Sequence, residues 1–341
     1  MEAQISRTNN FDLIRLFAAL QVLVGHVFVH LKVDGYSTFL TIEGYFPGVL
    51  MFFTISGFLI TYSLDRNRDN IKKYFVNRFL RIYPALWCCV GITLIIMCLQ
   101  EWGGVNPWDI IKWLLAQLTF FQFYTPDSLR IWGVGTPNGS LWTIPVEIQF
   151  YAILPLLFIL YFKYRRKYVL YLLFLFSLIF NVFLFDKDNT ITEKLLRNTC
   201  LPYLYNFLIG SILYLNWNKI RRYLEGKFLI WLILFMAFCC GMDAHPSYYF
   251  HSVADFISNI LLSLMTIAAA FTLPHCGKVL HGYDLSYGIY IYHMVVVNFF
   301  VSNGWLYRVE YVLLVALITL ILSILSWRLI EKRALALKNR L

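Results

Sequence analysis

Long apolar segments alternate with short polar ones along almost the whole chain. Segments close to the length at which a helix spans a bilayer, about 20 residues, recur ten times. They lie at 11–31, 43–64, 84–101, 141–162, 168–185, 200–217, 228–240, 255–273, 284–303 and 309–330. The segment at 108–124 is shorter and rich in aromatic residues, and we interpret it as an interfacial or re-entrant helix. The pattern predicts an all-α, polytopic integral membrane protein with about ten transmembrane helices.

The basic residues in the polar segments predict how these helices are oriented. Cytoplasmic loops of membrane proteins carry an excess of Lys and Arg. With ten spans and a cytoplasmic N-terminus, 21 Lys and Arg fall on the inner side and seven on the outer side. If 108–124 also spanned the membrane, every later loop would change sides. We therefore expect both termini in the cytoplasm and one membrane-embedded domain over residues 1–341, with no appended soluble domain.

Composition supports a membrane protein and argues against nucleic-acid binding. The chain is 60% hydrophobic and only 14% charged, whereas soluble domains carry about 25% charged residues. The net charge is +10, but the basic residues sit in short clusters between apolar segments, so we expect no nucleic-acid partner. The seven cysteines show neither a metal-ligand spacing nor a disulfide framework, and no metal site is expected.

The first apolar segment contains four ionisable residues, Asp12, Arg15, His26 and His30. On a helix, Arg15 and His26 lie about 20° apart, and Asp12 and His30 lie about 40° to either side of His26. An ionisable group near the bilayer centre costs roughly 2.5–3.5 kcal/mol, so this stripe must face protein or a water-filled cavity. A packing network would explain one such residue. An aligned Arg and His favour a functional site.

Glu147 is a carboxylate about two turns inside the segment 141–162. A carboxylate at that depth needs a partner, and both Arg15 and His26 are candidates. Beside His26, the carboxylate would orient the imidazole and stabilise its protonated form, which favours a general base. An ion pair with Arg15 would instead be structural.

Arg78 and Arg81 lie three positions apart at the cytoplasmic end of the third apolar segment. Two guanidinium groups on one helix face form a fork that suits phosphate groups. Basic residues at this place also satisfy membrane topology and contact anionic membrane lipids. We interpret the pair as a phosphate-binding site.

Two other groups of residues have a functional and a structural interpretation of similar weight. Ser56 and Gly57 form a small-residue notch where a narrow ligand or another helix can approach closely. Tyr287, Tyr290 and His293 recur at intervals of three and present hydroxyl and imidazole groups on one helix face. That face would line a polar cavity or form an aromatic helix interface.

The chain resembles the acyltransferase-3 family of integral membrane acyltransferases, which O-acylate bacterial surface carbohydrates among other acceptors. Five elements in the family's order carry the resemblance, which extends over almost the whole chain. They are Arg15 followed by ten residues and His26, FFTISGFLI at 52–60, RFLRIYP at 78–84, SLWTIPVEIQFY at 140–151 with Trp142 and Glu147, and LSYGIYIYH at 285–293.

The resemblance implies an acyl-CoA donor on the cytoplasmic side, His26 as the essential catalytic residue, and arginines that support donor binding. No bound cofactor is expected, and acetyl-CoA would be the donor substrate. The expected protein is an O-acetyltransferase of the bacterial inner membrane that modifies a lipid-linked or growing surface polysaccharide such as O-antigen. A longer acyl group such as succinyl, another acceptor, and the oligomeric state stay open.

In the expected mechanism, the phosphates of CoA dock near Arg78 and Arg81. His26, positioned by Glu147 or Asp12, then takes the proton of a sugar hydroxyl. Arg15 would hold the stripe in register or stabilise developing negative charge. A covalent relay through an acyl-His or through acylated Ser56 is the mechanistic alternative. A transporter or flippase is the alternative class of protein, although no internal repeat supports it.

Overall fold

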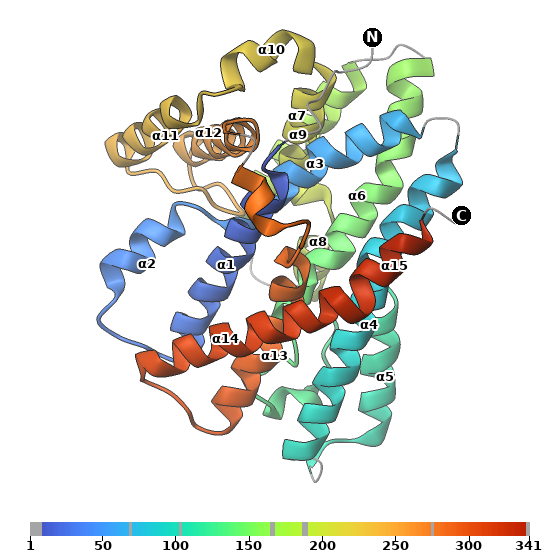
Figure 1. The fold of residues 1–341 in the computed structure, drawn as a ribbon, viewed down its shortest axis with the longest axis vertical. Helices are drawn as coiled ribbons and strands as arrows, with labels where there is room; N and C mark the ends of the chain where they lie inside the picture. The colour runs from blue at the N-terminus through green and yellow to red at the C-terminus, as the bar shows by residue number, and fades with distance from the viewer. Residues whose placement is uncertain are drawn as a thin grey trace. The chain divides into compact units, whose positions relative to one another are not determined.

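The computed structural model describes residues 9–67, 70–101, 104–163, 168–185, 190–273 and 276–338, and the regular elements of these residues are all helices (Figure 1). No strand occurs in these residues, which confirms the predicted all-α class. Arg7 and the basic segment 164–167, which contribute to the predicted topology, lie outside them.

Six helical stretches of the described residues are long and apolar enough to cross a membrane. They are Phe11–His30, Ser37–Arg66, Ile71–Glu101, Gly139–Tyr161, Val253–Ala270 and Val309–Leu337. The helices Trp217–Leu224 and Phe228–Met242 meet at 79° and make a seventh if they form one bent span. The spans expected at 168–185, 200–217 and 284–303 coincide with shorter apolar helices. The protein is therefore a multi-pass membrane protein by composition and helix length, while the count of ten stays a prediction.

The sides of the membrane also stay a prediction, and reporter fusions test them. Because basic residues favour the inner side by 21 to seven, fusions at both termini and within 65–83 are expected to report the cytoplasm. A fusion within 102–140 is expected to report the outside. A fusion within 163–167 that reported the outside would mean that 108–124 crosses the membrane.

The helix that carries Arg78 and Arg81 is longer than the apolar pattern predicts. Helix α4 runs from Ile71 to Glu101 and continues through Pro84. Proline removes a backbone donor and often kinks or ends a helix, but membrane helices tolerate it because neighbouring groups satisfy the freed carbonyl. Both arginines therefore lie on the helix itself and not in a loop before it.

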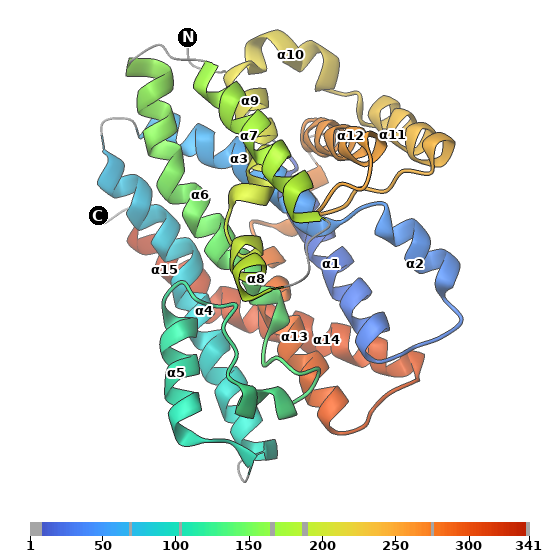
Figure 2. The same ribbon diagram turned by 180° about the vertical axis from the view of Figure 1, so that it is seen from behind.

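The segment 108–124 contains a single short helix, α5, at Pro107–Leu118. Its 12 residues are too few to span a hydrocarbon core about 30 Å thick. The indole nitrogen of Trp87 donates a 3.1 Å hydrogen bond to the Leu118 carbonyl, so α5 lies alongside α4 (Figure 2). This geometry agrees with an interfacial or re-entrant helix.

The chain divides into two compact units. The first contains Met1–Ala18, Gly44–Tyr74 and Val146–Gly282, and the second contains Ala19–Glu43, Phe75–Pro145 and Tyr283–Leu341. Elements wholly or mostly in the first are α3 (Gly48–Arg66), α6 (Thr143–Phe158), η4 (Ile159–Lys163), α7 (Tyr168–Phe185), α8 (Ile191–Arg197), η5 (Leu201–Tyr203), α9 (Leu204–Leu215), α10 (Trp217–Leu224), α11 (Phe228–Met242), α12 (Val253–Ala270) and η6 (Cys276–Leu280). Those of the second are α1 (Phe11–His30), α2 (Ser37–Gly44), α4, α5, η2 (Asp127–Ile131), η3 (Gly139–Trp142), α13 (Ser286–Ser302), α14 (Val309–Ser326), η7 (Trp327–Glu331) and α15 (Lys332–Leu337).

In the first unit, the backbones of α3 and α9 are in direct contact. A Cβ atom on Gly57 would lie 1.9 Å from the Phe207 carbonyl oxygen, and one on Gly210 would lie 2.1 Å from the Thr54 carbonyl oxygen. Small residues permit such close approach between membrane helices. The notch predicted at Ser56 and Gly57 is therefore occupied, at Gly57, by helix α9.

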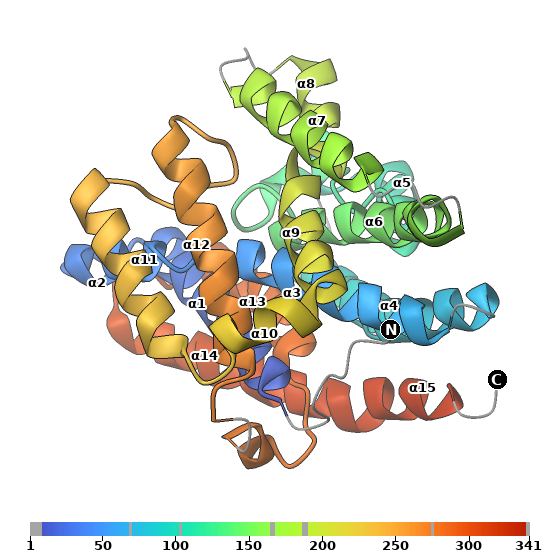
Figure 3. The ribbon, with the colours of Figure 1, turned by 90° about the horizontal axis from the view of Figure 1, so that it is seen from above.

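Hydroxyl groups tie the same helices together. The Thr61 and Ser211 hydroxyls lie 2.9 Å apart between α3 and α9, and the Thr54 and Ser263 hydroxyls lie 2.9 Å apart between α3 and α12. Hydrogen bonds between hydroxyl groups stabilise helix association where lipid offers no competing partner. In the same unit, helix α11 packs beside α12 (Figure 3).

Replacing Gly57 with alanine is expected to destabilise the first unit strongly. The added methyl group would meet backbone atoms of Phe207, so α3 and α9 must separate, and overpacking typically costs about 1–3 kcal/mol, occasionally more. We expect a lower thermal midpoint in detergent and less protein in the membrane. Gly91→Ala is the matched control, because nothing lies within 4 Å of a Cβ atom there. Equal midpoints for the two variants would contradict backbone contact at Gly57.

In the second unit, α13 is held by close packing on one side and by a polar segment on the other. A Cβ atom on Gly288 would lie 2.9 Å from the Cα atom of Ser323, so α13 packs tightly on α14. The side-chain amide of Asn298 donates to the carbonyls of Thr136 and Pro137 at 2.8 and 2.9 Å. These contacts fix the position of α13, which carries His293.

Candidate active site

Helix α1 is continuous from Phe11 to His30, which confirms that Arg15 and His26 share one helix face. Asp12 lies in the first turn, where a negative charge suits the helix dipole, and His30 lies in the last turn. Asp12 is exposed, and Arg15, His26 and His30 are partly exposed. Arg15 belongs to the first unit and His26 to the second.

His26 forms a hydrogen bond with His293, which lies 267 positions further along the chain. The Nδ1 atom of His26 and the Nε2 atom of His293 are 2.8 Å apart. The two rings are stacked, with their centroids 5.1 Å apart. His293 is 0% exposed. The sequence placed both histidines on polar faces but did not pair them.

The second nitrogen of His293 determines where the hydrogens lie in this pair. Its Nδ1 atom is 3.1 Å from the carbonyl oxygen of Ile289, and because a carbonyl oxygen only accepts, this nitrogen carries the hydrogen. A neutral His293 then presents an unprotonated Nε2 atom. His26 must therefore donate through Nδ1, and its own Nε2 atom holds a free lone pair.

The Nε2 atom of His26 forms no hydrogen bond within the described part of the chain. His30 lies one turn further along α1, with its ring centroid 5.7 Å from that of His26. No hydrogen bond joins His26 to His30 among the described residues. Within the described residues, one ring nitrogen of the partly buried His26 is therefore hydrogen-bonded and the other is not.

Tyr290 and Tyr287 belong to hydrogen-bonded contacts between elements of the second unit. The Tyr290 hydroxyl lies 2.8 Å from the Thr143 hydroxyl and donates to the Ser140 carbonyl at 2.9 Å. The Tyr287 hydroxyl donates to the Ile82 carbonyl at 2.9 Å. For these two residues the structure favours a helix interface over a cavity lining.

Arg81 forms an ion pair with Asp284 within the second unit. The two side chains are 14% and 10% exposed, so the pair is largely buried. Asp284 also accepts a 2.6 Å hydrogen bond from the Ser286 hydroxyl at the start of α13. Arg78 is partly exposed on the same helix. Sequence reasoning missed Asp284, although an Asp two residues before Ser286 is typical of a helix start.

Glu147 lies in the first unit together with Ser56 and Tyr151. The Ser56 hydroxyl donates to Glu147 Oε1 at 2.8 Å, and the Tyr151 hydroxyl donates to the same oxygen. Among the described residues Glu147 forms no ion pair, so the structural pair with Arg15 is not found. The predicted roles of Glu147 and Asp12 in orienting His26 stay predictions. Tyr151 could have been found, because it lies four positions after Glu147 on the same helix.

Trp142 ends η3 directly before α6 and is partly exposed.

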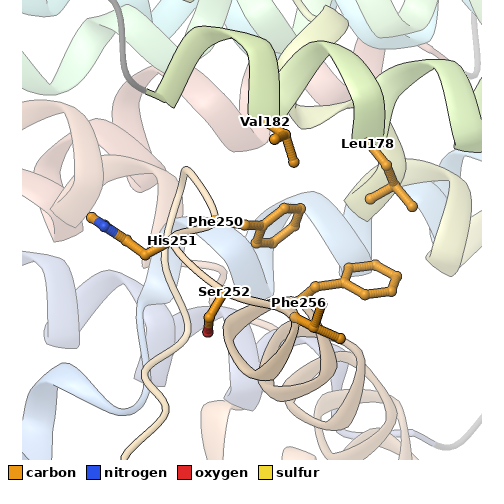
Figure 4. A pocket seen from close by; sticks show the side chains of 7 residues that line it. Leu178, Val182, Phe250, His251, Ser252 and Phe256 are labelled. Carbon is orange, nitrogen blue, oxygen red and sulfur yellow. The ribbon is translucent and has the colours of Figure 1, made fainter.

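None of the predicted site residues lines the apolar pocket of about 390 Å³ in the first unit. That pocket is formed by Leu178, Val182, Phe250, His251, Ser252, Val253 and Phe256. The imidazole of His251 points away from its interior (Figure 4).

The helices are those of a multi-pass membrane protein, and the second unit holds a hydrogen-bonded pair of histidines. The chain belongs to the acyltransferase-3 family, whose acyltransferase domain matches residues 8–328. It is therefore a membrane acyltransferase, as the five sequence elements predict.

Three curated relatives match nearly the whole chain. Nodulation protein 10 of Rhizobium leguminosarum bv. viciae is 33% identical and covers 98% of this chain and 95% of its own length. The O-acetyl transferase of Shigella phage Sf6 is 28% identical and covers 96% of each protein. A putative peptidoglycan O-acetyltransferase of Bacillus subtilis (strain 168) is 26% identical over 94% of this chain, which matches 54% of that protein. No solved structure matches the chain.

Proposed function

We propose that the protein is an O-acetyltransferase of the bacterial inner membrane. It transfers an acetyl group from acetyl-CoA to a hydroxyl group of a lipid-linked or growing surface polysaccharide such as O-antigen. The names of the Shigella phage and Bacillus relatives support the acetyl group and the oxygen acceptor. The observation that carries the proposal is the free Nε2 atom of His26, held by the hydrogen bond to His293.

His26 acts as the general base in this reaction. Its Nε2 atom takes the proton of the acceptor hydroxyl while the hydroxyl oxygen attacks the thioester carbonyl. The new C–O bond forms, the C–S bond breaks, and the proton on His26 passes to the departing thiolate, so that CoA leaves as a thiol. The role of Arg15 in stabilising the developing negative charge stays a prediction, because Arg15 lies eleven positions, about 16 Å along the helix axis, from His26.

Arg78 and Arg81 would bind the phosphates of the donor. Guanidinium groups bind phosphate oxygens in a bidentate manner. Because Arg81 is paired with Asp284, donor phosphates would share this guanidinium with the carboxylate. Arg78, one turn away on the same helix, is partly exposed like Arg81 and would be the second phosphate-binding group.

A covalent relay through Ser56 is the alternative to direct transfer. The hydrogen bond from the Ser56 hydroxyl to Glu147 favours it, because a carboxylate base can activate a serine hydroxyl. Acid quenching of a reaction with radiolabelled acetyl-CoA distinguishes the two routes. Label that stays on wild-type protein and is missing from Ser56→Ala would establish the relay, whereas unlabelled protein with normal turnover supports direct transfer.

The overall function is tested by two measurements. Purified protein in nanodiscs should convert acetyl-CoA to free CoA only when a hydroxyl acceptor is supplied. On deletion of the gene, mass spectrometry of surface glycans should show the loss of the ~42 Da that is added when an acetyl group replaces a hydroxyl hydrogen. Unchanged glycans together with no acetyl-CoA turnover would refute an acetyltransferase, and a different mass loss would identify another acyl group.

A further inference from the structure

We propose that His293 is a positioning residue that holds His26 in the one neutral tautomer able to act as a base. The proposal rests on the proposed function, because it assigns a role within the same reaction. In this role, the buried imidazole of His293 takes the place of the carboxylate that commonly orients a catalytic histidine. Neither the family match nor the names of the relatives assigns this role.

The Ile289 carbonyl lies four positions before His293 on α13. This carbonyl accepts from His293 Nδ1 at 3.1 Å and so places the only hydrogen of a neutral ring on that atom. A second hydrogen on His293 would make it a cation. Its side chain is fully buried and forms no ion pair among the described residues, so that cation would be costly.

The position of the hydrogen on His293 determines the tautomer of His26, because a 2.8 Å hydrogen bond joins the two rings. Because His293 Nε2 accepts, His26 Nδ1 donates, and the base is therefore Nε2. In the other tautomer Nε2 would carry the hydrogen and could not take a proton from a hydroxyl. A residue that fixes the tautomer acts on the chemical step without touching the substrate.

When Nε2 takes the acceptor proton, His26 becomes an imidazolium that still donates through Nδ1. The lone pair of His293 Nε2 then faces that positive charge and stabilises it. No proton needs to leave His26 toward His293, since the proton on Nε2 returns to the thiolate of CoA. The packing of α13 on α14 at Gly288 and Ser323 keeps His293 in place for both states.

The test uses His293→Phe, which keeps a ring in the buried site and removes the acceptor. We expect kcat per folded protein to fall roughly 10²-fold, within the contribution of a general base, with the KM for acetyl-CoA changed less than about twofold. His293→Gln returns an acceptor oxygen and is expected to recover part of kcat. His30→Phe is the matched control, because His30 contacts the same ring without a hydrogen bond, and it should keep kcat.

A double substitution separates positioning from packing. Because His293 acts through His26, adding His293→Phe to His26→Gln should cost no further activity. A further loss equal to that of the single His293→Phe variant would overturn the proposal. So would a His293→Phe variant of normal kcat.

A spectroscopic measurement tests the tautomer without using activity. In protein labelled with ¹⁵N-histidine, the His26 signal, assigned as the one missing from His26→Gln, should report a protonated Nδ1 in the wild type. That signal should shift toward protonated Nε2 in His293→Phe. A wild-type His26 protonated at Nε2 would refute the positioning role even if the enzyme is an acetyltransferase. If wild-type His26 is protonated at Nδ1 but the protein transfers no acetyl group, the proposed function would be refuted instead.

Discussion

Replacing His26 with glutamine is expected to reduce acyl transfer about 10²–10⁴-fold per folded protein, the typical contribution of general base catalysis. Glutamine is close in size and keeps hydrogen-bonding capacity, so it can still contact His293. It cannot take a proton from a hydroxyl, because its amide has no basic nitrogen. The measurement is turnover of acetyl-CoA in nanodiscs, normalised to the amount of folded protein. Donor binding should persist.

His30→Gln is the matched control for that variant. His30 lies one turn away on α1, and no sequence element of the family includes it. It should keep most of its activity. A His26→Gln protein that is present at normal amounts and still transfers at a near wild-type rate would remove His26 from the mechanism. Loss of both abundance and transfer in His26→Gln, with equal losses in His30→Gln, would make the histidines structural.

Arg81→Lys is expected to raise the KM for acetyl-CoA about 10- to 100-fold, which corresponds to the roughly 1.5–3 kcal/mol of a charge-assisted hydrogen bond. Lysine keeps the positive charge but loses the planar fork that binds a phosphate in a bidentate manner. The ammonium group can still pair with Asp284, so the protein should reach the membrane in normal amounts. Steady-state kinetics with varied acetyl-CoA measures the effect.

Lys72→Gln controls for net charge at the same end of α4. Lys72 is exposed, and its removal lowers the charge without touching the ion pair of Arg81 and Asp284. The KM for acetyl-CoA should stay near the wild-type value. Unchanged donor KM in both Arg78→Lys and Arg81→Lys would assign the two arginines to lipid contact and topology.

The helices were predictable because membrane helices need long apolar segments, and this requirement is visible in the chain itself. Every predicted span coincides with a helix. The limits of α4 were not predictable in this way. The first half, Ile71–Pro84, contains four basic residues among apolar ones, and it continues as helix because packing of an amphipathic face stabilises a helix without a continuous apolar segment.

The candidate site was predictable residue by residue but not contact by contact. Helical spacing relates Arg15 to His26 because both lie on α1. It contains no information on the pairing of His26 with His293, since that pairing depends on how α13 packs beside α1. Glu147 was expected to contact Arg15 or His26. Its hydrogen bonds with Ser56 and Tyr151 were not predicted, because they too depend on how the helices pack.

The length of α13 bears on how the protein fits the bilayer. Its 17 residues extend about 25 Å, whereas the hydrocarbon core of a typical bilayer is about 30 Å thick. The side chains along α13 are almost all buried, so neighbouring helices and not lipid chains surround it. Those helices can absorb the difference in length, and no thinning of the bilayer is required at His293. The chain length of the surrounding phospholipids is therefore not expected to change the transfer rate through this helix.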